Sequence, residues 1–259
     1  MKKILLAIPC YNCATQLKRL LDELKMDPVL KIINQILIID NCSMDETYSM
    51  ALNMAGIFPK EKIIVMKNPI NLGLGGSFKK IVNFSYENKF EYFFLLHGDN
   101  QASVSDLKFF LNLVENTSYD AYLGARFMPN SVLINYSRAR KMANLFLNQL
   151  FSFFLPTKIF DLGSGLNLYR TSVFPISFVE NLPTHLAFDL PLLLYFLEYK
   201  KKFEFIPITW KQEDEESNAR NIPLFIQLIS IFFHWRIKSY LRFLLRSQDL
   251  DKSRIFFHK

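Results

Sequence analysis

Short apolar runs alternate with amphipathic segments through the first 116 residues. Runs rich in β-branched and aromatic residues predict strands at Ile4–Ile8, Ile36–Ile39, Ile63–Met66 and Tyr92–Leu96. The segments between them repeat apolar residues every three or four positions, which predicts helices at Thr15–Lys25, Asp45–Ala55, Gly76–Asn88 and Asp106–Glu115. This alternation predicts an α/β fold with a mostly parallel sheet that is flanked by helices.

The rhythm changes after about residue 120. Strands are predicted at Ala121–Gly124, Leu166–Tyr169 and Phe203–Pro207, and helices at Ser137–Phe154, Ala187–Leu197 and Ile222–Leu245. We find no linker before about residue 215, so residues 1–218 are predicted to form one domain and residues 219–259 a basic amphipathic helical tail.

Charge and phenylalanine are distributed unevenly. The net charge is +7, of which residues 220–259 contribute +6, and phenylalanine occupies 26 of 259 positions, so it fills a core or lies on a surface. A tail that is both basic and apolar favours an anionic membrane surface and argues against nucleic acid. A homo-oligomer interface, or packing on the sheet, is the alternative for this helix.

The sequence also indicates a compartment. No run of 18 apolar residues occurs, and the first apolar run stops at Pro9, which is too short for a signal peptide. The three cysteines, Cys10, Cys13 and Cys42, agree with a reducing environment. We therefore expect a cytoplasmic protein, peripheral at the inner face of the cell membrane.

Polar, turn-forming residues follow each of the first four predicted strands, where ligands bind in open parallel sheets. These segments are 9–12, 40–47, 71–76 and 97–101. Any one of them is also typical of a helix cap or an ordinary loop, and Ser43 with Glu46 fits a capping box. Four such segments at one edge of one sheet favour a binding site.

Over roughly residues 1–215 these segments resemble the inverting nucleotide-sugar glycosyltransferases of family 2, which have the GT-A fold. Ile8-Pro9-Cys10-Tyr11-Asn12 is similar to the family's "P-x-Y-N" turn. Residues 40–47, Asp-Asn-Cys-Ser-Met-Asp-Glu-Thr, are similar to its "D-D-G-S-x-D-x-T" segment, with Asn41 in place of the second Asp. Asn71-Leu72-Gly73, followed by two further glycines, matches its "N-x-G" loop.

The resemblance implies a donor site for a nucleotide sugar, either a UDP-sugar or a GDP-sugar. Pro9, Tyr11 and Asn12 would line the base pocket, and Asp40 would accept a hydrogen bond from the base or ribose. Asn71 and Gly73 would lie at the diphosphate. Gly75 and Gly76 have no side chains, so they would allow the backbone at the helix N-terminus to approach the diphosphate closely.

The resemblance also implies a metal ion. The family carries "D-x-D", and the corresponding residues here are His97-Gly98-Asp99. Asp99 would hold Mg²⁺ or Mn²⁺ against the diphosphate. His97 either adds a nitrogen ligand, which is more plausible for Mn²⁺, or contacts the nucleotide without touching the metal.

A catalytic base is expected at Asp189, where the family has an acidic residue at the start of a late helix. Inverting transfer needs a base to deprotonate an acceptor hydroxyl, but a phosphate acceptor is already ionised at neutral pH. The alternative for Asp189, a lone carboxylate in an apolar run, is a helix cap.

Two further segments resemble the polyprenyl-phosphate sugar transferase branch of the family. These are residues 161–170, similar to "D-x-x-S-G-x-x-x-x-R", and Gly124-Ala125-Arg126-Phe127. The resemblance implies that Arg126, Arg138 and Arg140 hold an acceptor phosphate, although Arg138 and Arg140 are also typical of a plain surface. The expected acceptor is a polyprenyl phosphate; the alternative is a glycan or lipid-linked saccharide of cell-surface polysaccharide synthesis.

Residues 209–218 lack the "Q-x-x-R-W" motif of processive polysaccharide synthases, and this absence favours transfer of a single sugar. We expect this polar loop either to close over the donor or to be a solvated turn.

Two other classes compete with this interpretation. Cys10-Tyr11-Asn12-Cys13 has the C-x-x-C spacing of thioredoxin-like oxidoreductases. A catalytically degenerate nucleotide-sugar-binding protein is the other candidate, and His97 is the residue that suggests it.

Overall fold

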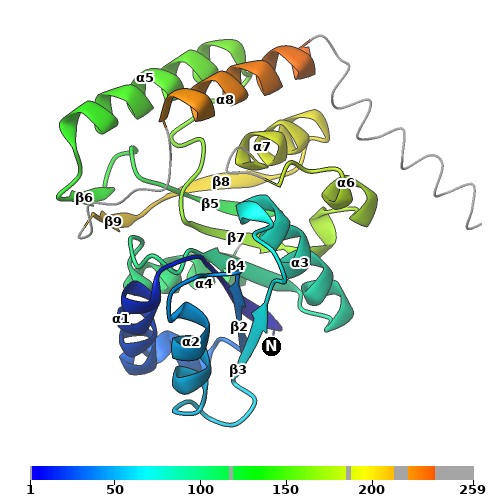
Figure 1. The fold of residues 1–259 in the computed structure, drawn as a ribbon. Coiled ribbons are helices and arrows are strands. Elements are labelled where there is room, and N and C mark those ends of the chain that lie inside the picture. Colours follow the sequence, from blue (N-terminus) through cyan, green and yellow to red (C-terminus); the bar gives the residue numbers. More distant parts are fainter. Residues whose placement is uncertain (1, 117–118, 185–187, 213–220, 237–259) are drawn as a thin grey trace, which may run out of the picture.

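The computed structural model describes residues 2–116, 119–184, 188–212 and 221–236 of the chain (Figure 1). Over these ranges, a seven-stranded sheet has the order β3-β2-β1-β4-β7-β5-β8, and β6 and β9 form a separate two-stranded sheet. The strands are β1 (Ile4–Cys10), β2 (Gln35–Asp40), β3 (Ile63–Lys67), β4 (Tyr92–Leu96), β5 (Ala121–Ala125), β6 (Val132–Ile134), β7 (Leu166–Arg170), β8 (Phe203–Pro207) and β9 (Thr209–Lys211).

Helices cover both faces of the large sheet (Figure 1). The α-helices are α1 (Ala14–Met26), α2 (Thr47–Ala55), α3 (Gly73–Glu87), α4 (Leu107–Asn116), α5 (Arg138–Phe154), α6 (Ile176–Glu180), α7 (Asp189–Glu198) and α8 (Asn221–Arg236). Short 3₁₀ turns lie at Pro28–Lys31, Val104–Asp106 and Thr171–Val173.

The direction of one strand decides what gathers at the edge of the sheet. β1 is parallel to β2 and β4, β2 to β3, and β5 to β8, whereas β7 runs antiparallel between β4 and β5. The last residue of β4, Leu96, is therefore paired with the first residue of β7, Leu166. The segment before β7 and the segment after β5 thus reach the same edge as the carboxyl ends of β1–β4. The predicted mostly parallel sheet with flanking helices is confirmed.

The core lies in two layers because successive strand residues point to opposite faces. In β1, Leu5 and Ala7 pack toward α3, α6 and α7, whereas Ile4, Leu6 and Ile8 pack toward α1, α2 and α4. Phenylalanine fills much of the first layer: the Phe78 ring lies 5.0–5.9 Å from the rings of Phe93, Tyr169, Phe174 and Phe188. Rings at these distances stabilise one another beyond simple burial of area.

The predicted elements are largely confirmed, with three differences. α3 begins at Gly73, so the glycine-rich segment is the first turn of the helix rather than a loop before it. β6, β9 and α6 were not predicted, because two are three-residue strands and the third is a five-residue helix. The polar segment expected at 209–218 begins as β9, and its residues 213–218 lie outside the described ranges.

Helix α8 packs beside α5 (Figure 1), where the ring of Phe232 lies 5.4 Å from that of Phe151. The rest of the predicted helix, residues 237–245, lies outside the described ranges, so a separate tail from residue 219 stays a prediction. Among the described helices, none is both long and apolar enough to cross a membrane.

Candidate active site

The ends of β1, β2, β3 and β4 lie next to one another because these strands are neighbours in the sheet. We call the residues at these ends the β1–β4 edge. It contains the following candidates: Pro9, Tyr11, Asn12, Asp40, Asn71, Gly73, His97 and Asp99. We call the residues after β5, before β7 and at the start of α7 the β5–β7 edge, which contains Arg126 and Asp189.

Asn12 ties the first strand's loop to the second. Its φ is 48°, and its backbone N–H donates to the Ser43 hydroxyl at 2.9 Å. Its side-chain oxygen accepts from the Met44 N–H at 2.8 Å. Ser43 does not form the capping box with Glu46, because Glu46 is itself the cap residue of α2, and the Thr47 N–H donates to the Asp45 carboxylate at 3.0 Å. Asn12 organises the pocket wall rather than projecting freely into it.

Pro9 and Tyr11 flank this junction. Pro9 is buried in β1, and its carbonyl oxygen accepts from the Gly98 N–H at 3.1 Å, which joins the ends of β1 and β4. The side chain of Tyr11 is half-buried. Of these two predicted pocket residues, Tyr11 is the one with a ring partly open to solvent.

Asp40 is fully buried at the end of β2. Its carboxylate accepts from the Ser43 N–H at 3.2 Å, and the Lys67 ammonium lies 3.9 Å from its other oxygen. The same ammonium lies 5.0 Å from the centre of the Tyr48 ring. A buried carboxylate retained beside one cation can accept a hydrogen bond from a ligand N–H or hydroxyl group.

Asn41 is the centre of an amide network. Its side-chain NH₂ donates to Asn71 Oδ1 at 2.7 Å, and its own Oδ1 accepts from Asn68 Nδ2 and from the Leu72 N–H, both at 2.9 Å. Asn71 Oδ1 also accepts from the Gly73 N–H at 2.8 Å. An amide both donates and accepts, which a carboxylate does not. This accounts for Asn41 at a position where the family pattern has Asp.

The glycines of α3 serve the packing of the helix start. Gly73 has a φ of 68°, in the left-handed region that favours glycine. A Cβ on Gly75 would lie 2.1 Å from the Pro183 carbonyl oxygen, and the N–H groups of Gly75 and Gly76 donate to the Thr184 carbonyl oxygen at 2.8 and 3.3 Å. In this structure the helix N-terminus is therefore closed by the 183–184 backbone rather than open to an anion.

His97 and Asp99 form the polar tip of β4. The backbone N–H of His97 donates to the Gly165 carbonyl oxygen at 2.9 Å, and this bond links the tip of β4 to the segment before β7. Burial lowers the pKa of His97, and the nearby Asp99 charge opposes that shift only in part. The imidazole is therefore held neutral. The carboxylate of Asp99 accepts one hydrogen bond from the described residues, from the Gln101 N–H at 3.2 Å.

This tip fits a cation shared with a ligand rather than a cage made by the protein alone. The described part of the chain holds no group of three or more His, Cys, Asp or Glu side chains placed for a metal ion. Mg²⁺ is commonly held by one or two carboxylates together with substrate phosphates. Asp99 supplies one weakly bonded carboxylate, so the residues fit a divalent ion that a diphosphate completes.

Arg126 and Asp161 form a buried two-pronged ion pair at the β5–β7 edge. The Nε and backbone N–H of Arg126 donate to Asp161 Oδ2 at 2.7 and 2.9 Å, and Nη2 donates to Asp161 Oδ1 at 2.8 Å. Nη2 also donates to the Gly163 carbonyl oxygen, and the guanidinium lies 5.0 Å from the Trp210 ring. Asp161 raises the pKa of Arg126 despite burial, so the guanidinium stays charged.

Asp189 is the first residue of α7 and does not cap it. The residue before it, Phe188, is the cap, and no side chain closes the helix start. The Asp189 carboxylate accepts no hydrogen bond from the described residues. Burial and the charge of Asp161 raise its pKa well above its usual value, and Arg126 opposes them. A raised pKa makes a carboxylate a stronger base than an ordinary Asp.

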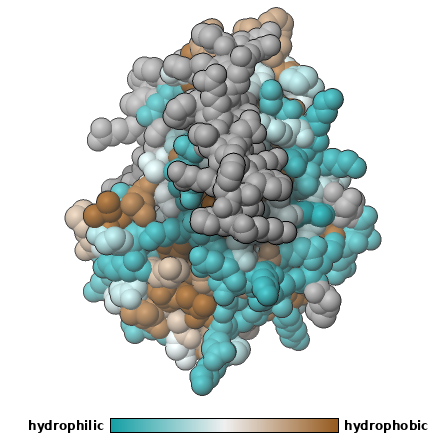
Figure 2. Space-filling model, turned by 90° about the vertical axis from the view of Figure 1, so that its right-hand side faces the viewer, coloured by the Kyte–Doolittle hydropathy of each residue, from teal (hydrophilic) through white to brown (hydrophobic). Residues whose placement is uncertain are grey.

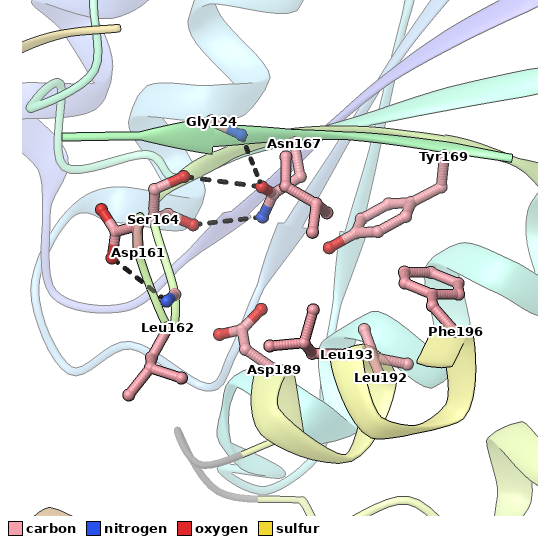
Figure 3. Close-up of a pocket in the computed structure, with 12 residues that line it drawn as sticks. Gly124, Asp161, Leu162, Ser164, Asn167, Tyr169, Asp189, Leu192, Leu193 and Phe196 are labelled. Carbon is pink, nitrogen blue, oxygen red and sulfur yellow. Dashed lines mark hydrogen bonds between the residues drawn. The ribbon is translucent and has the colours of Figure 1, made fainter. Parts of the chain in front are cut away.

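A cavity of about 20 Å³ lies between Asp161, Asp189 and Tyr169 (Figure 3). In that view the Asp189 carboxylate projects from α7 toward the segment of Asp161, and the Tyr169 hydroxyl points to the same space. Such a volume holds one water molecule, not a sugar. A Cβ on Gly163 would lie 2.8 Å from Asp189 Oδ2, so the two segments are closely packed there.

The three arginines predicted to hold the acceptor phosphate differ in burial and in their distance from the site. Arg138 is exposed at the start of α5, and Arg140 is half-buried. The charges of Arg126 and Arg140 both act to lower the pKa of Tyr136, although burial leaves it raised. Arg140 therefore lies on the same side as Arg126, near the Tyr136 hydroxyl.

The C-x-x-C pair is buried and does not resemble a redox centre. Cys10 and Cys13 are free thiols with 3% and 6% exposure. Burial and the neighbouring Cys13 raise the pKa of the Cys10 thiol, so it is a poor nucleophile. A Cβ on Gly98 would lie 2.4 Å from Cys10 Sγ, which shows that the thiols are packing for the β4 tip.

Sequence reasoning left Asp161, Trp210 and Tyr136 out of the candidate residues. Asp161 opens the segment 161–170 that was quoted for the resemblance. The indication that could have marked it as a site residue is a buried Asp that pairs with a buried Arg. Nothing local indicates Trp210, because β9 is three residues long and brings the indole to Arg126 only through tertiary folding.

Comparisons with known proteins identify the family and the fold. The sequence profile of the family described as "Glycosyl transferase family 2" matches residues 6–175. An uncharacterized protein of Methanocaldococcus jannaschii is 25% identical over 167 residues, which is 64% of each chain, so the chain spans less than two thirds of that relative.

Solved structures share the fold. Glucosyl-3-phosphoglycerate synthase from Mycobacterium tuberculosis superposes with a TM-score of 0.66 at 11% identity, covering 88% of this chain and 77% of that one. Mannosyl-3-phosphoglycerate synthase from Rubrobacter xylanophilus gives 0.63 at 13% identity, covering 91% and 75%. The Mycobacterium tuberculosis protein has been seen with Mn²⁺, UDP and phosphoglyceric acid. The GT-A-like fold expected from the sequence is confirmed.

Proposed function

The chain belongs to glycosyl transferase family 2, and from that premise we propose that it moves a single sugar, with inversion, from a UDP- or GDP-sugar to a polyprenyl phosphate. The observation that carries the proposal is that the β1–β4 edge and the β5–β7 edge, which differ in their chemistry, lie side by side. A tip with the weakly bonded carboxylate of Asp99 lies beside a buried cluster of Arg126, Asp161 and Asp189.

The donor occupies the β1–β4 edge in this proposal. Asp40 accepts a hydrogen bond from the base or ribose, and Tyr11 packs on the base where its ring is open. Asp99 would hold Mg²⁺ or Mn²⁺, and the ion would supply neutralisation of the negative charge on the departing nucleoside diphosphate. His97, kept neutral by burial, contacts the donor without adding charge.

The acceptor approaches from the β5–β7 edge. An acceptor oxygen attacks the anomeric carbon as the bond to the diphosphate breaks, so the configuration of that carbon is inverted. Asp189 takes the proton when the acceptor oxygen carries one, and its raised pKa makes it a stronger base for this task.

A phosphate-bearing acceptor fits the cations of this edge. Asp161 and Gly163 occupy Nε and Nη2 of Arg126 and leave Nη1 without a hydrogen-bond partner among the described residues. Nη1 of Arg126, Arg140 and the Tyr136 hydroxyl are therefore the groups proposed to contact the phosphate, with Arg138 at the rim. The structural neighbour from Mycobacterium tuberculosis also binds a phosphate-bearing small molecule, phosphoglyceric acid. A polyprenyl phosphate places the enzyme at the inner face of the cell membrane.

A thermal-shift panel of UDP, GDP, CMP and dTDP, each with and without Mn²⁺, tests the donor site. We expect one nucleotide to raise the melting temperature in a metal-dependent way, because it binds the native state alone. The absence of a shift with all four nucleotides would leave a degenerate fold rather than an enzyme.

Substitution Asp99→Asn sharpens the same test. We expect it to remove the Mn²⁺-dependent part of the shift and to reduce transfer by roughly a hundredfold or more, since it weakens charge stabilisation of the leaving group. Stability without ligand should change little because Asp99 accepts only one hydrogen bond in the described structure. An unchanged metal-dependent shift would remove Asp99 from the metal site.

A further inference from the structure

Helix α5 exposes a stripe of large apolar side chains. Met142, Phe146 and Phe153 are 65%, 63% and 82% exposed, and they recur at the spacing that places residues on one helix face. Two side chains of α5, Asn148 and Phe151, are buried, so most of this 17-residue helix faces outward. A soluble surface rarely keeps so many exposed rings together without a partner.

The stripe continues onto α8 through ring contacts. Phe154, 48% exposed, lies 5.1 Å from Phe153 and 5.6 Å from Phe232, and Phe232 lies 6.1 Å from Phe233, which is 57% exposed. We call the exposed side chains Met142, Phe146, Phe153, Phe154 and Phe233 the α5–α8 face. The two helices lie side by side at the outer end of the molecule (Figure 1).

Basic residues border this face. Arg138 and Lys141 are exposed in the first turn of α5, and α5 has no acidic residue. On the face drawn in Figure 2, outside the grey atoms, hydrophobic residues form patches separated by hydrophilic ones.

We propose that the α5–α8 face docks on an anionic lipid bilayer, with the Phe side chains inserted at the headgroup boundary and the basic first turn of α5 against lipid phosphates. An exposed apolar stripe with cations at its border is typical of helices that lie in a membrane interface. The basic first turn of α5 also connects the α5–α8 face with the proposed acceptor site. Arg140 follows Arg138 by half a turn of the helix and lies near Tyr136. This inference rests on the proposed function only in the membrane location of the acceptor.

A second copy of the chain is the less suitable occupant. Five side chains of this size, between 48% and 82% exposed, offer on the order of 600 Å², because an aromatic side chain presents roughly 150–250 Å². A stable interface uses about 800 Å² from each partner. The cations at one end of the stripe also match anionic lipid better than an identical cationic surface.

Vesicle flotation of the full chain tests the proposal. We expect binding to equimolar phosphatidylglycerol and phosphatidylcholine vesicles and much weaker binding to phosphatidylcholine alone. Phe146→Ser combined with Phe153→Ser should lower binding roughly tenfold or more, because two inserted rings are lost. Phe109→Ser, at an exposed Phe of α4, is the matched control and should bind as the native chain does.

Charge reversal supplies the second arm. Lys141→Glu should reduce binding to the anionic vesicles by about five- to tenfold, whereas Lys108→Glu on α4 should not. Full binding by the double Phe variant, or no binding by the native chain, would overturn the proposal. Light scattering that shows a dimer dispersed by Phe146→Ser with Phe153→Ser would overturn it in favour of a second copy.

The same samples separate this proposal from the proposed function. The thermal shift with nucleotide and Mn²⁺ should persist in every α5 variant, which also shows that each variant is folded. Vesicle binding without any nucleotide shift would remove the proposed function and leave the membrane surface in place.

Discussion

The β1–β4 edge and the β5–β7 edge face each other across one site, yet they are held by different forces. Many of the bonds between loops of the β1–β4 edge are neutral, such as those of Asn12 with Ser43 and Met44, and the carboxylates of Asp40 and Asp45 add charged contacts with Lys67 and the Ala14 N–H. The β5–β7 edge is held by buried charge: Asp161 pairs with Arg126, and beside them lies the Asp189 carboxylate, which accepts no hydrogen bond from the described residues.

The difference separates positioning from reactivity. Neutral hydrogen bonds fix loop shape and leave carboxylates such as Asp99 available for a ligand. Buried charges are costly unless they are paired, so a second carboxylate beside a single cation has a raised pKa and is a stronger base than an exposed one. The β1–β4 edge is therefore suited to binding, and the β5–β7 edge to proton transfer.

Asp189→Asn is expected to have the largest effect. It should leave the nucleotide shift intact and reduce transfer by roughly a hundred- to ten-thousandfold, since an amide cannot accept the proton. Transfer assays at saturating donor, together with the thermal shift, measure the two effects separately. Retained transfer would indicate that the acceptor is already ionised or that Asp189 has a structural role only.

The same variant gives a stability prediction with a defined sign. Because the folded protein raises the pKa of Asp189, it binds a proton there more tightly than the unfolded chain does. The stability that this tighter proton binding adds to the native chain is fully present below the ordinary Asp pKa near 4, and it is lost as pH rises through the raised pKa. Denaturant unfolding should therefore show Asp189→Asn gaining stability relative to the native chain as pH increases over this window, with no gain below it.

Breaking the buried ion pair is expected to have the next largest effect. Arg126→Gln or Asp161→Asn alone should lower the free energy of unfolding by about 3–5 kcal/mol, because each leaves an unpaired buried charge. The double variant should lose less than the sum of the two. Additive losses in denaturant unfolding would show that the pair is not coupled. Asp161→Asn should also move the pH profile of transfer to lower pH, since Asp161 raises the pKa of Asp189.

Asn41→Asp tests the neutral edge and should have the smallest effect. A carboxylate cannot donate to Asn71 Oδ1, which the Gly73 N–H holds in its acceptor orientation. We expect a loss of about 1–3 kcal/mol in the free energy of unfolding. Asn53→Asp, an exposed position on α2, is the control and should change stability by less than about 0.5 kcal/mol. Equal stability of both variants would mean that the network tolerates a charge.

The β1–β4 edge was more predictable than the β5–β7 edge for a physical reason. Its residues lie at or soon after the ends of β1, β2, β3 and β4, and parallel strands bring their carboxyl ends together. The pairing of Arg126 with Asp161 needed β7 to enter antiparallel beside β4, which no local pattern indicates. The bonds of Gly75 and Gly76 to Thr184 likewise depend on a segment about 110 residues away.

The sequence alone determined the α/β order of elements, the family, and the polar groups at the strand ends, because hydrophobic periodicity and short motifs are local properties. Tertiary structure alone decided which carboxylate is paired and which is not, since Asp161 and Asp189 differ only in what surrounds them. It also decided where the surplus of phenylalanine lies. Phe78 and Phe151 are buried while Phe146 and Phe153 face outward, because burial depends on which helix face meets the rest of the fold.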